Sequence, residues 1–175
     1  MVALSRTEDQ LAAALKVVEE SDASVIEKAE MLMEIAMGLQ QRPKEADDLL
    51  AAIELYEQAI HQCGDQDALL TARIRARMAT ALMAIPSEIA APIEQARDLL
   101  KQAISVLAEG GSGEELAEAE MNLGLALQTL AGAGMARRAC RAQARTGRAL
   151  GAGTRPRTDT RLRDLRPPRL IQRST

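Results

Sequence analysis

Aromatic residues are almost absent from this sequence: Tyr56 is the single one, and there is no Phe or Trp. Many single-strand nucleic-acid-binding proteins stack bases on aromatic side chains, and apolar ligand pockets are usually lined by them. The scarcity of aromatics therefore argues against several classes of nucleic-acid-binding domain and against most cofactor sites. The hydrophobic fraction of 47% comes almost entirely from Ala, the aliphatic residues and Met.

Long apolar runs and cysteine clusters are lacking as well. No segment reaches the roughly 18 consecutive apolar residues of a transmembrane helix, and the first residues are not followed by a secretory h-region and cleavage site. The two cysteines, Cys63 and Cys140, lie far apart in the chain, which suggests neither a disulfide framework nor a metal-binding knuckle. We expect a cytoplasmic protein with no membrane contact and with reduced thiols.

Side chains that could carry chemistry are also few. His61 is the only histidine and lies two residues from Cys63, a spacing that directs the two side chains of a helix apart and does not suit one metal ion. No second histidine is available to activate a cysteine or serine nucleophile. The turn at 110–113 lacks the Lys and Ser/Thr of a phosphate-binding loop. We therefore predict no enzymatic activity, no cofactor and no metal.

Cys63, the methionines and the acidic residues of the expected helices are predicted to have structural roles rather than roles in catalysis or metal binding. We predict that Cys63 is a small packing residue. The eight methionines are expected mainly to fill a core that is poor in aromatics. The acidic groups have no calcium-loop spacing and are predicted to be solvated helix faces: Asp47, Asp48, Glu54, Glu114, Glu115, Glu118 and Glu120.

What the sequence does have is helical periodicity, which runs from Thr7 to about Leu130 and predicts an all-α fold. The helices are expected to begin near positions 7, 24, 44, 67, 92 and 113. Capping-box spacing occurs at Thr7 with Gln10 and at Ser24 with Glu27. Helix ends are predicted at Pro43, Gly64, Pro86 and the turn at 110–113, with Asp65 or Asp67 capping the fourth helix.

Two of the expected helix pairs are copies of one another. Glu57–Ile60 corresponds to Lys101–Ile104 at an offset of 44 residues, and both contain Gln-Ala-Ile. A second set corresponds at an offset of 45: Met78, Ala81, Leu82 and Ile85 match Leu123, Ala126, Leu127 and Leu130. A repeat of this length indicates an array of stacked helix pairs.

The residues of this repeat resemble those of the tetratricopeptide repeat (TPR) family. A large side chain between two small ones, typical of the second TPR helix, occurs at Ala52, Tyr56 and Ala59 and again at Ala96, Leu100 and Ala103. The pattern of the first TPR helix, in which a small residue follows a large aliphatic one, occurs at Asn122-Leu123-Gly124 with Leu127 and at Met78-Ala79 with Leu82.

The resemblance implies an α-solenoid of antiparallel helix pairs. An N-terminal helix would occupy residues 1–23, followed by TPR-like repeats over 24–135: units 24–63 and 65–108 and a half unit 112–131. The period of 44–45 residues exceeds the usual 34 or so, as in bacterial-type helix-pair repeats with a longer period, and a HEAT-like array is the alternative. The family's Trp and closing Pro are missing here.

Such a solenoid works as a protein-interaction scaffold, because its first helices line a groove that binds a partner peptide or protein. In the expected register, Arg73 and Arg77 lie on one face and could hold a carboxylate, while Asn122 could hold a peptide backbone. The residues expected to line this groove are Arg73, Arg77, Thr80, Glu118, Asn122 and Leu125.

The last unit is expected to have only its first helix, so one side of that helix would lack the second helix that normally covers it. Apolar positions such as Leu123, Leu127 and Leu130 would be exposed unless something covers them, because terminal units of such arrays need a polar outer face. We therefore expect self-association through this open unit.

The formal net charge of −3 averages two unlike regions. Residues 136–175 hold twelve Arg, no Lys and two acids, a net charge of +10, whereas the first 135 residues have a net charge of −13. With its Gly and Pro content, this basic low-complexity tail is expected to be disordered. The tail has two possible roles: it could contact nucleic-acid phosphates, or it could contact an acidic protein surface. If it contacts phosphates, the protein is associated with nucleic acid, which is the alternative function.

Two other interpretations of residues 136–175 remain open. A GC-rich gene read out of frame after codon 135 would give the same composition, and the chain could then be a fragment of a larger multidomain TPR protein. Alternatively, residues 137–150 could form an ordered helix in the place of the second helix of the third unit, where Ala142 and Ala149 keep the small positions but Thr146 occupies the large one.

Overall fold

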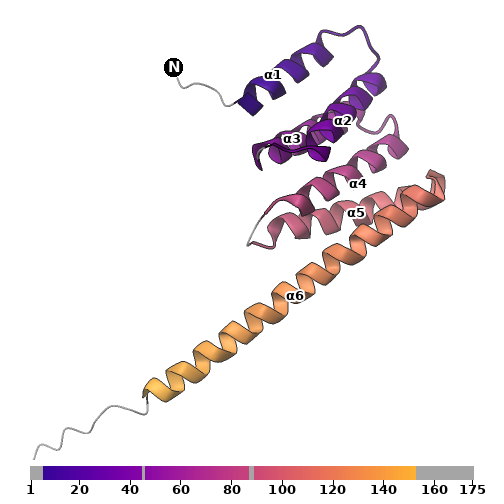
Figure 1. Ribbon diagram of the computed structural model, residues 1–175. Coiled ribbons are helices and arrows are strands. Elements are labelled where there is room, and N and C mark those ends of the chain that lie inside the picture. The colour runs from indigo at the N-terminus through magenta and orange to yellow at the C-terminus, as the bar shows by residue number, and fades with distance from the viewer. Residues whose placement is uncertain (1–5, 45, 87–88, 153–175) are drawn as a thin grey trace, which may run out of the picture. The chain divides into compact units, whose positions relative to one another are not determined.

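The computed structural model describes residues 6–44, 46–86 and 89–152, and all regular structure in these ranges is helical (Figure 1). The side chains of residues 6, 46, 137 and 139–152 lie outside this description. The chain divides into two units, Met1–Met135 and Ala136–Thr175. The helices are α1 (Arg6–Glu19), α2 (Val25–Gln41), α3 (Ala46–Cys63), α4 (Ala68–Ala84), α5 (Ala91–Gly110) and α6 (Gly113–Ala152).

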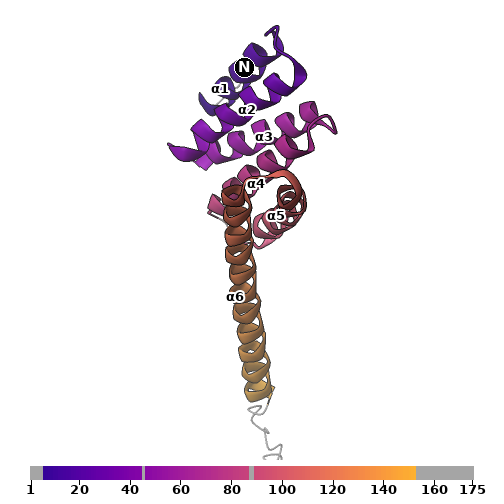
Figure 2. The ribbon, with the colours of Figure 1, turned by 90° about the vertical axis from the view of Figure 1, so that its right-hand side faces the viewer.

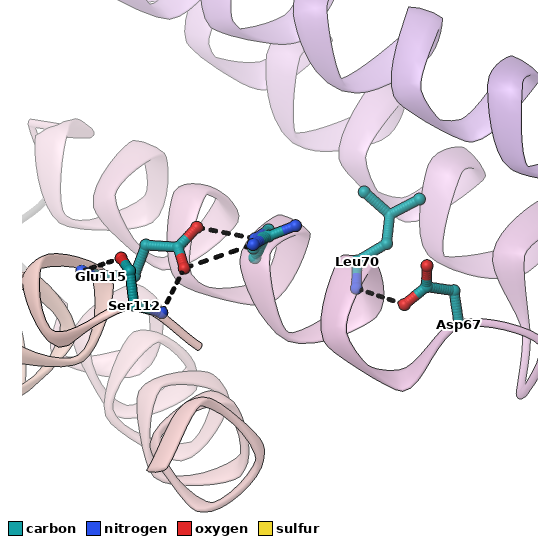
Figure 3. Close-up of polar contacts among 5 residues, drawn as sticks. Asp67, Leu70, Ser112 and Glu115 are labelled. Atoms are coloured by element: carbon teal, nitrogen blue, oxygen red, sulfur yellow. Dashed lines mark hydrogen bonds and ion pairs between the residues drawn. The ribbon is translucent and has the colours of Figure 1, made fainter. Parts of the chain in front are cut away.

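Most of the predicted helix ends are confirmed, because local side-chain chemistry determines them. Ser24 and Glu27 form the predicted capping box: the Ser24 amide donates to Glu27 Oε2 at 2.7 Å, and the Glu27 amide donates to Ser24 Oγ at 3.3 Å. Hydrogen bonding of the Glu27 carboxyl with the Ser24 backbone, and secondarily with the Ser24 side chain, lowers the pKa of that carboxyl. Gly64 ends α3 with a φ of 52°, a left-handed conformation that favours glycine, and Asp67 caps α4 by accepting from the Leu70 amide at 2.8 Å (Figure 3).

The capping box predicted at Thr7 and Gln10 is wrong. Helix α1 already includes Thr7, whose hydroxyl donates to Asp48 Oδ1 in α3 at 3.2 Å. The other Asp48 oxygen accepts from the Lys44 amide at 2.7 Å. Asp48 is therefore buried and not, as predicted, part of a solvated face, although the neighbouring Asp47 is exposed as expected. A tertiary contact between α1 and α3 accounts for both differences.

Replacing Asp48 by Ala is expected to lower the free energy of unfolding by about 2 kcal/mol, the value of hydrogen bonds to a charged group. Urea unfolding followed by circular dichroism measures this change. The matched control is Asp47→Ala in the same turn, which should cost about 0.5 kcal/mol or less because the side chain is exposed. Equal effects of the two substitutions would show that the Thr7–Asp48 contact contributes nothing.

The helices of residues 6–135 pack mainly with their neighbours in the chain. The most extensive contacts join α2 to α3 and α4 to α5, α3 and α4 connect the two pairs, and α1 packs on both α2 and α3. In Figures 1 and 2, α1 to α5 follow one another in space in chain order. The pairs are those expected from the internal repeat.

The core follows the small–large–small pattern of the repeat. All six positions are fully buried: Ala52, Tyr56 and Ala59 in α3, and Ala96, Leu100 and Ala103 in α5. Alanine at these positions lets neighbouring helices approach closely, and the large side chain at the central position, Tyr56 or Leu100, fills space at the contact. Cys63 and Leu107 end the two buried stripes, which confirms that Cys63 is a packing residue.

The tail differs from the prediction at its start. Disorder was expected from residue 136, whereas residues 136–152 belong to α6. No proline interrupts residues 113–152, and Ala, Arg and Leu are strong helix formers that offset the glycines. Residues 153–175, on which the rest of that expectation falls, lie outside the described residues.

Candidate protein-interaction surface

Two arginines of α4 face the first turns of α6. Arg73 Nε lies 2.6 Å from Glu115 Oε1, and its Nη2 donates to the second oxygen of the same carboxylate at 3.4 Å. Arg77 Nη1 lies 3.0 Å from Glu118 Oε1. The i, i+4 spacing of the arginines matches the i, i+3 spacing of the glutamates, because both place side chains on one face of a helix. The two helices are thus joined by a pair of charged contacts.

Glu115 is the most constrained member of this group. Its Oε2 accepts from the Ser112 amide at 2.9 Å, and its own amide donates to Ser112 Oγ at 3.2 Å, so that the two residues form a capping box at the start of α6 (Figure 3). The hydrogen bonds from Arg73 and from the Ser112 backbone lower the pKa of the Glu115 carboxyl. A lowered pKa means that the contact stabilises the folded chain above the ordinary glutamate pKa, and that this stabilisation is lost as the pH falls through the lowered value.

Between these side chains lies a small hollow of about 30 Å³. A volume of this size holds one or two water molecules, and it is far below the size of a ligand pocket. The four charged side chains remain 30–42% exposed, so a macromolecule can reach them from solvent. The hollow is lined by Arg73, Ala76, Arg77, Leu107, Glu115, Glu118, Ala119 and Asn122. We call this set the α4–α6 charged surface.

A chain of hydrogen bonds connects α4 to the first helix pair. The Tyr56 hydroxyl donates to Gln40 Oε1 at 2.8 Å, and Gln40 Nε2 donates to Thr80 Oγ1 at 2.7 Å. The Thr80 hydroxyl in turn donates to the Arg77 carbonyl at 2.7 Å. Burial raises the pKa of the Tyr56 phenol, which keeps its proton available for this bond. The network ties α2, α3 and α4 together.

The structure brings four of the six predicted groove residues to one place. Arg73, Arg77, Glu118 and Asn122 all line the hollow. Thr80 is engaged by Gln40 instead, and Leu125 is 52% exposed and lies outside the lining.

Two expectations about the charges need correction. The arginines were expected to be available for a partner carboxylate, but each already has a glutamate partner. Glu115 and Glu118 were expected on a solvated face, and both are paired, while Glu114 and Glu120 are exposed as predicted. Glu115 was missed as a site residue. The Ser112-x-x-Glu115 spacing of a capping box was the available signal for its position, but the contact with Arg73 depends on tertiary packing.

The other side chains that could bind a metal ion or act as nucleophiles do not form a cluster among the described residues. His61 is exposed, and the Cys63 thiol is buried 3.4 Å from the Asp67 carbonyl oxygen. Within residues 6–44, 46–86 and 89–152, no group of His, Cys, Asp and Glu could hold a metal ion. Nor is any helix in the described part of the chain long and apolar enough to cross a membrane. The side chain of Cys140 lies outside the described residues.

Comparisons of the chain with known protein families, characterised proteins and solved structures gave no match. The function is therefore inferred from the residues and the geometry of the chain itself.

Proposed function

We propose that residues 1–135 form a protein-interaction module whose docking site is the α4–α6 charged surface. The observation that carries this proposal is the half-exposed Arg73–Glu115 and Arg77–Glu118 pairs around a hollow too small for a small-molecule ligand. These side chains carry positive and negative charges, are accessible to solvent and are held on two helices. Such an arrangement suits recognition of another protein. The module has no chemistry of its own in this proposal.

The proposed architecture is a TPR-like α-solenoid, in which α2, α4 and α6 are the first helices of successive units. Support comes from the equal burial of the small–large–small positions in α3 and α5 and from the extensive contacts within the pairs α2–α3 and α4–α5. The first helices of such an array share one surface. The contacts of Gln40 with Thr80, and of Arg77 with Glu118, run along that surface from α2 through α4 to α6.

The existing ion pairs do not prevent binding by a partner. Ion pairs that are this exposed contribute only about 0–1 kcal/mol each. A partner carboxylate can therefore replace a glutamate at either arginine, and a partner cation can take up the released glutamate, at little net cost. Asn122 beside them offers an amide that can donate to and accept from a peptide backbone. The partner segment is proposed to carry both an acidic and a basic residue.

The test exchanges the charges of one pair within the full chain. The double variant Arg77→Glu/Glu118→Arg keeps an ion pair between α4 and α6 but reverses the charges presented to a partner. Affinity capture from an extract of the source cells should recover a partner with the wild type and not with this variant, although thermal unfolding of the two chains should be the same. Glu115 is left in place because it also caps α6.

The result that contradicts the proposal is recovery of the same partner in equal amount by the exchanged variant. The single variant Arg77→Glu, which faces Glu118 with a like charge, completes the comparison. If the surface itself is the docking site, Arg77→Glu should abolish binding while the helical content stays the same.

The alternative function, nucleic-acid association, depends on the net charge of +10 in residues 136–175. Binding through phosphate contacts would weaken steeply with salt, because each neutralised phosphate releases counterions. Measuring the salt dependence of partner binding before and after deletion of residues 136–175 separates the two functions. Only the alternative predicts a steep dependence that disappears with the deletion.

A further inference from the structure

A cleft lies where α1 packs against the first helix pair. Helix α1 contacts both α2 and α3, but less extensively than these two helices contact each other. The space that remains between the three helices has a volume of about 390 Å³. Unlike the hollow of the α4–α6 charged surface, it falls within the range of about 300–1,000 Å³ that is typical of small-molecule sites. We call this space the α1–α3 cleft, and it is lined by Gln10, Leu11, Ala14, Ile35, Gly38, Leu39, Arg42, Lys44, Asp48 and Leu55.

The walls of the α1–α3 cleft are aliphatic. They consist of half-buried side chains of α1 and α2, which pack against the core, and of one fully buried side chain of α3: Leu11, Ala14, Ile35, Leu39 and Leu55. Because no aromatic residue is among the lining residues, a planar ring would find no stacking partner there. Walls of this kind suit a flexible alkyl chain, whose burial removes apolar surface from water.

Gly38 contributes open space to the cleft. It lies within α2 and lines the cleft, and a Cβ atom at this position would meet no atom within 4 Å. Glycine within a helix costs about 1 kcal/mol relative to alanine, so helix formation does not account for this residue. A large side chain at position 38 is therefore expected to occupy part of the cleft.

Two cations and one carboxylate line the cleft near the connection between α2 and α3. Arg42 and Lys44 are exposed, and neither takes part in an ion pair within the described part of the chain. Asp48 is buried and already accepts from the Thr7 hydroxyl and the Lys44 amide. The C-terminus of α2 and the N-terminus of α3 meet here, so their opposite dipole ends offset each other. The two cations outnumber the carboxylate, which favours an anionic group at this end.

We propose that the α1–α3 cleft binds a small amphiphile that has an alkyl chain and a carboxylate, of the chemical class of medium-chain fatty acids. The alkyl chain would lie against the aliphatic walls, and the carboxylate would accept hydrogen bonds from Arg42 and Lys44. A cationic amphiphile does not suit the site, because its charged group would meet these two cations. The inference does not depend on the function proposed above, since the cleft and the α4–α6 charged surface share no lining residue.

The test is isothermal titration calorimetry of the full-length protein with decanoate, below the concentration at which decanoate forms micelles. Saturable binding is expected. Decyltrimethylammonium, which has an alkyl chain of the same length and a positive charge, should bind at least about tenfold more weakly. The double variant Arg42→Gln/Lys44→Gln should weaken decanoate binding by about tenfold, because two exposed charged contacts are lost. It should not weaken the binding of decyltrimethylammonium.

A substitution that fills the cleft tests the position of the alkyl chain. Gly38→Leu should weaken decanoate binding by about tenfold or more. The thermal stability of this variant should be unchanged or higher, since leucine is the better helix former and its Cβ meets open space. The matched control is Gly124→Leu in α6, which is also exposed and has no atom within 4 Å of a Cβ. Gly124 does not line the cleft, so the control should bind decanoate like the wild type.

Four results would overturn the proposal. The first is the absence of saturable decanoate binding, and the second is equal binding by the wild type and the Gly38→Leu variant. The third is equal affinity for decanoate and decyltrimethylammonium, which would indicate apolar adsorption without recognition of the carboxylate. The fourth is a dimer of the protein alone, seen by sedimentation and abolished by Gly38→Leu, because a second copy would then fill the cleft.

Discussion

Replacement of Tyr56 by Ala is expected to lower the free energy of unfolding by about 3–5 kcal/mol, the range for removing a large buried aromatic side chain. Tyr56 is fully buried between Ala52 and Ala59 on the buried stripe of α3, next to the equally buried Leu55, and it is the largest fully buried side chain of the described residues. Its loss leaves a cavity that alanine neighbours cannot fill, and it also removes the hydroxyl that donates to Gln40. Chemical denaturation of the full chain measures the change.

Two other variants separate packing from hydrogen bonding at this position. Tyr56→Phe keeps the ring and should cost only about 1 kcal/mol, the net value of a hydrogen bond. Leu100→Ala, at the corresponding position of the second copy, should cost about 2–5 kcal/mol. If Tyr56→Ala destabilised the chain no more than Tyr56→Phe, the large position of the repeat would not be a packing position.

Replacement of Ala103 by Leu is expected to destabilise the fold by about 1–3 kcal/mol or more, because it places extra volume at a close helix contact. Ala103 is fully buried, as is its counterpart Ala59 in α3. The substitution improves neither the core nor the helix, since alanine already has the highest helix propensity. The change in the urea midpoint reports the effect.

The matched control for overpacking is Ala108→Leu in the same helix. Ala108 is exposed, so the larger side chain meets solvent and should change stability by about 0.5 kcal/mol or less. Equal stability of the Ala103→Leu and Ala108→Leu variants would contradict the close approach of helices at the small positions.

Features determined by neighbouring residues were predictable from the sequence. The Ser24–Glu27 capping box, the left-handed Gly64 and the Asp67 cap are local, and each occurs where the pattern indicated. The offset of 44 residues between α3 and α5 identified which side chains are buried, because equivalent positions of a repeat meet equivalent neighbours.

Features that depend on tertiary contacts were not predictable in the same way. Asp48 lies in an acidic sequence that predicts an exposed face, but the Thr7 hydroxyl of a distant helix donates a hydrogen bond to it. Arg73 and Arg77 were correctly placed on one face of α4, but their pairing with Glu115 and Glu118 depends on how α6 packs. Charged side chains have long reach and weak local preference, so sequence spacing alone does not assign their partners.

The course of α6 shows how composition can mislead. The content of arginine, glycine and proline suggested disorder from residue 136, yet the helix continues to Ala152. Glycine within a helix costs only about 1 kcal/mol relative to alanine, whereas proline, the stronger helix breaker, first recurs at Pro156.

Hydrogen exchange of the full chain, with and without a captured partner, tests the central claim most directly. If the α4–α6 charged surface is the docking site, binding should slow exchange in residues 70–80 of α4 and 113–123 of α6. Protection confined to residues 136–175, with α4 and the first turns of α6 unchanged, would contradict the claim and would favour recognition through the basic segment.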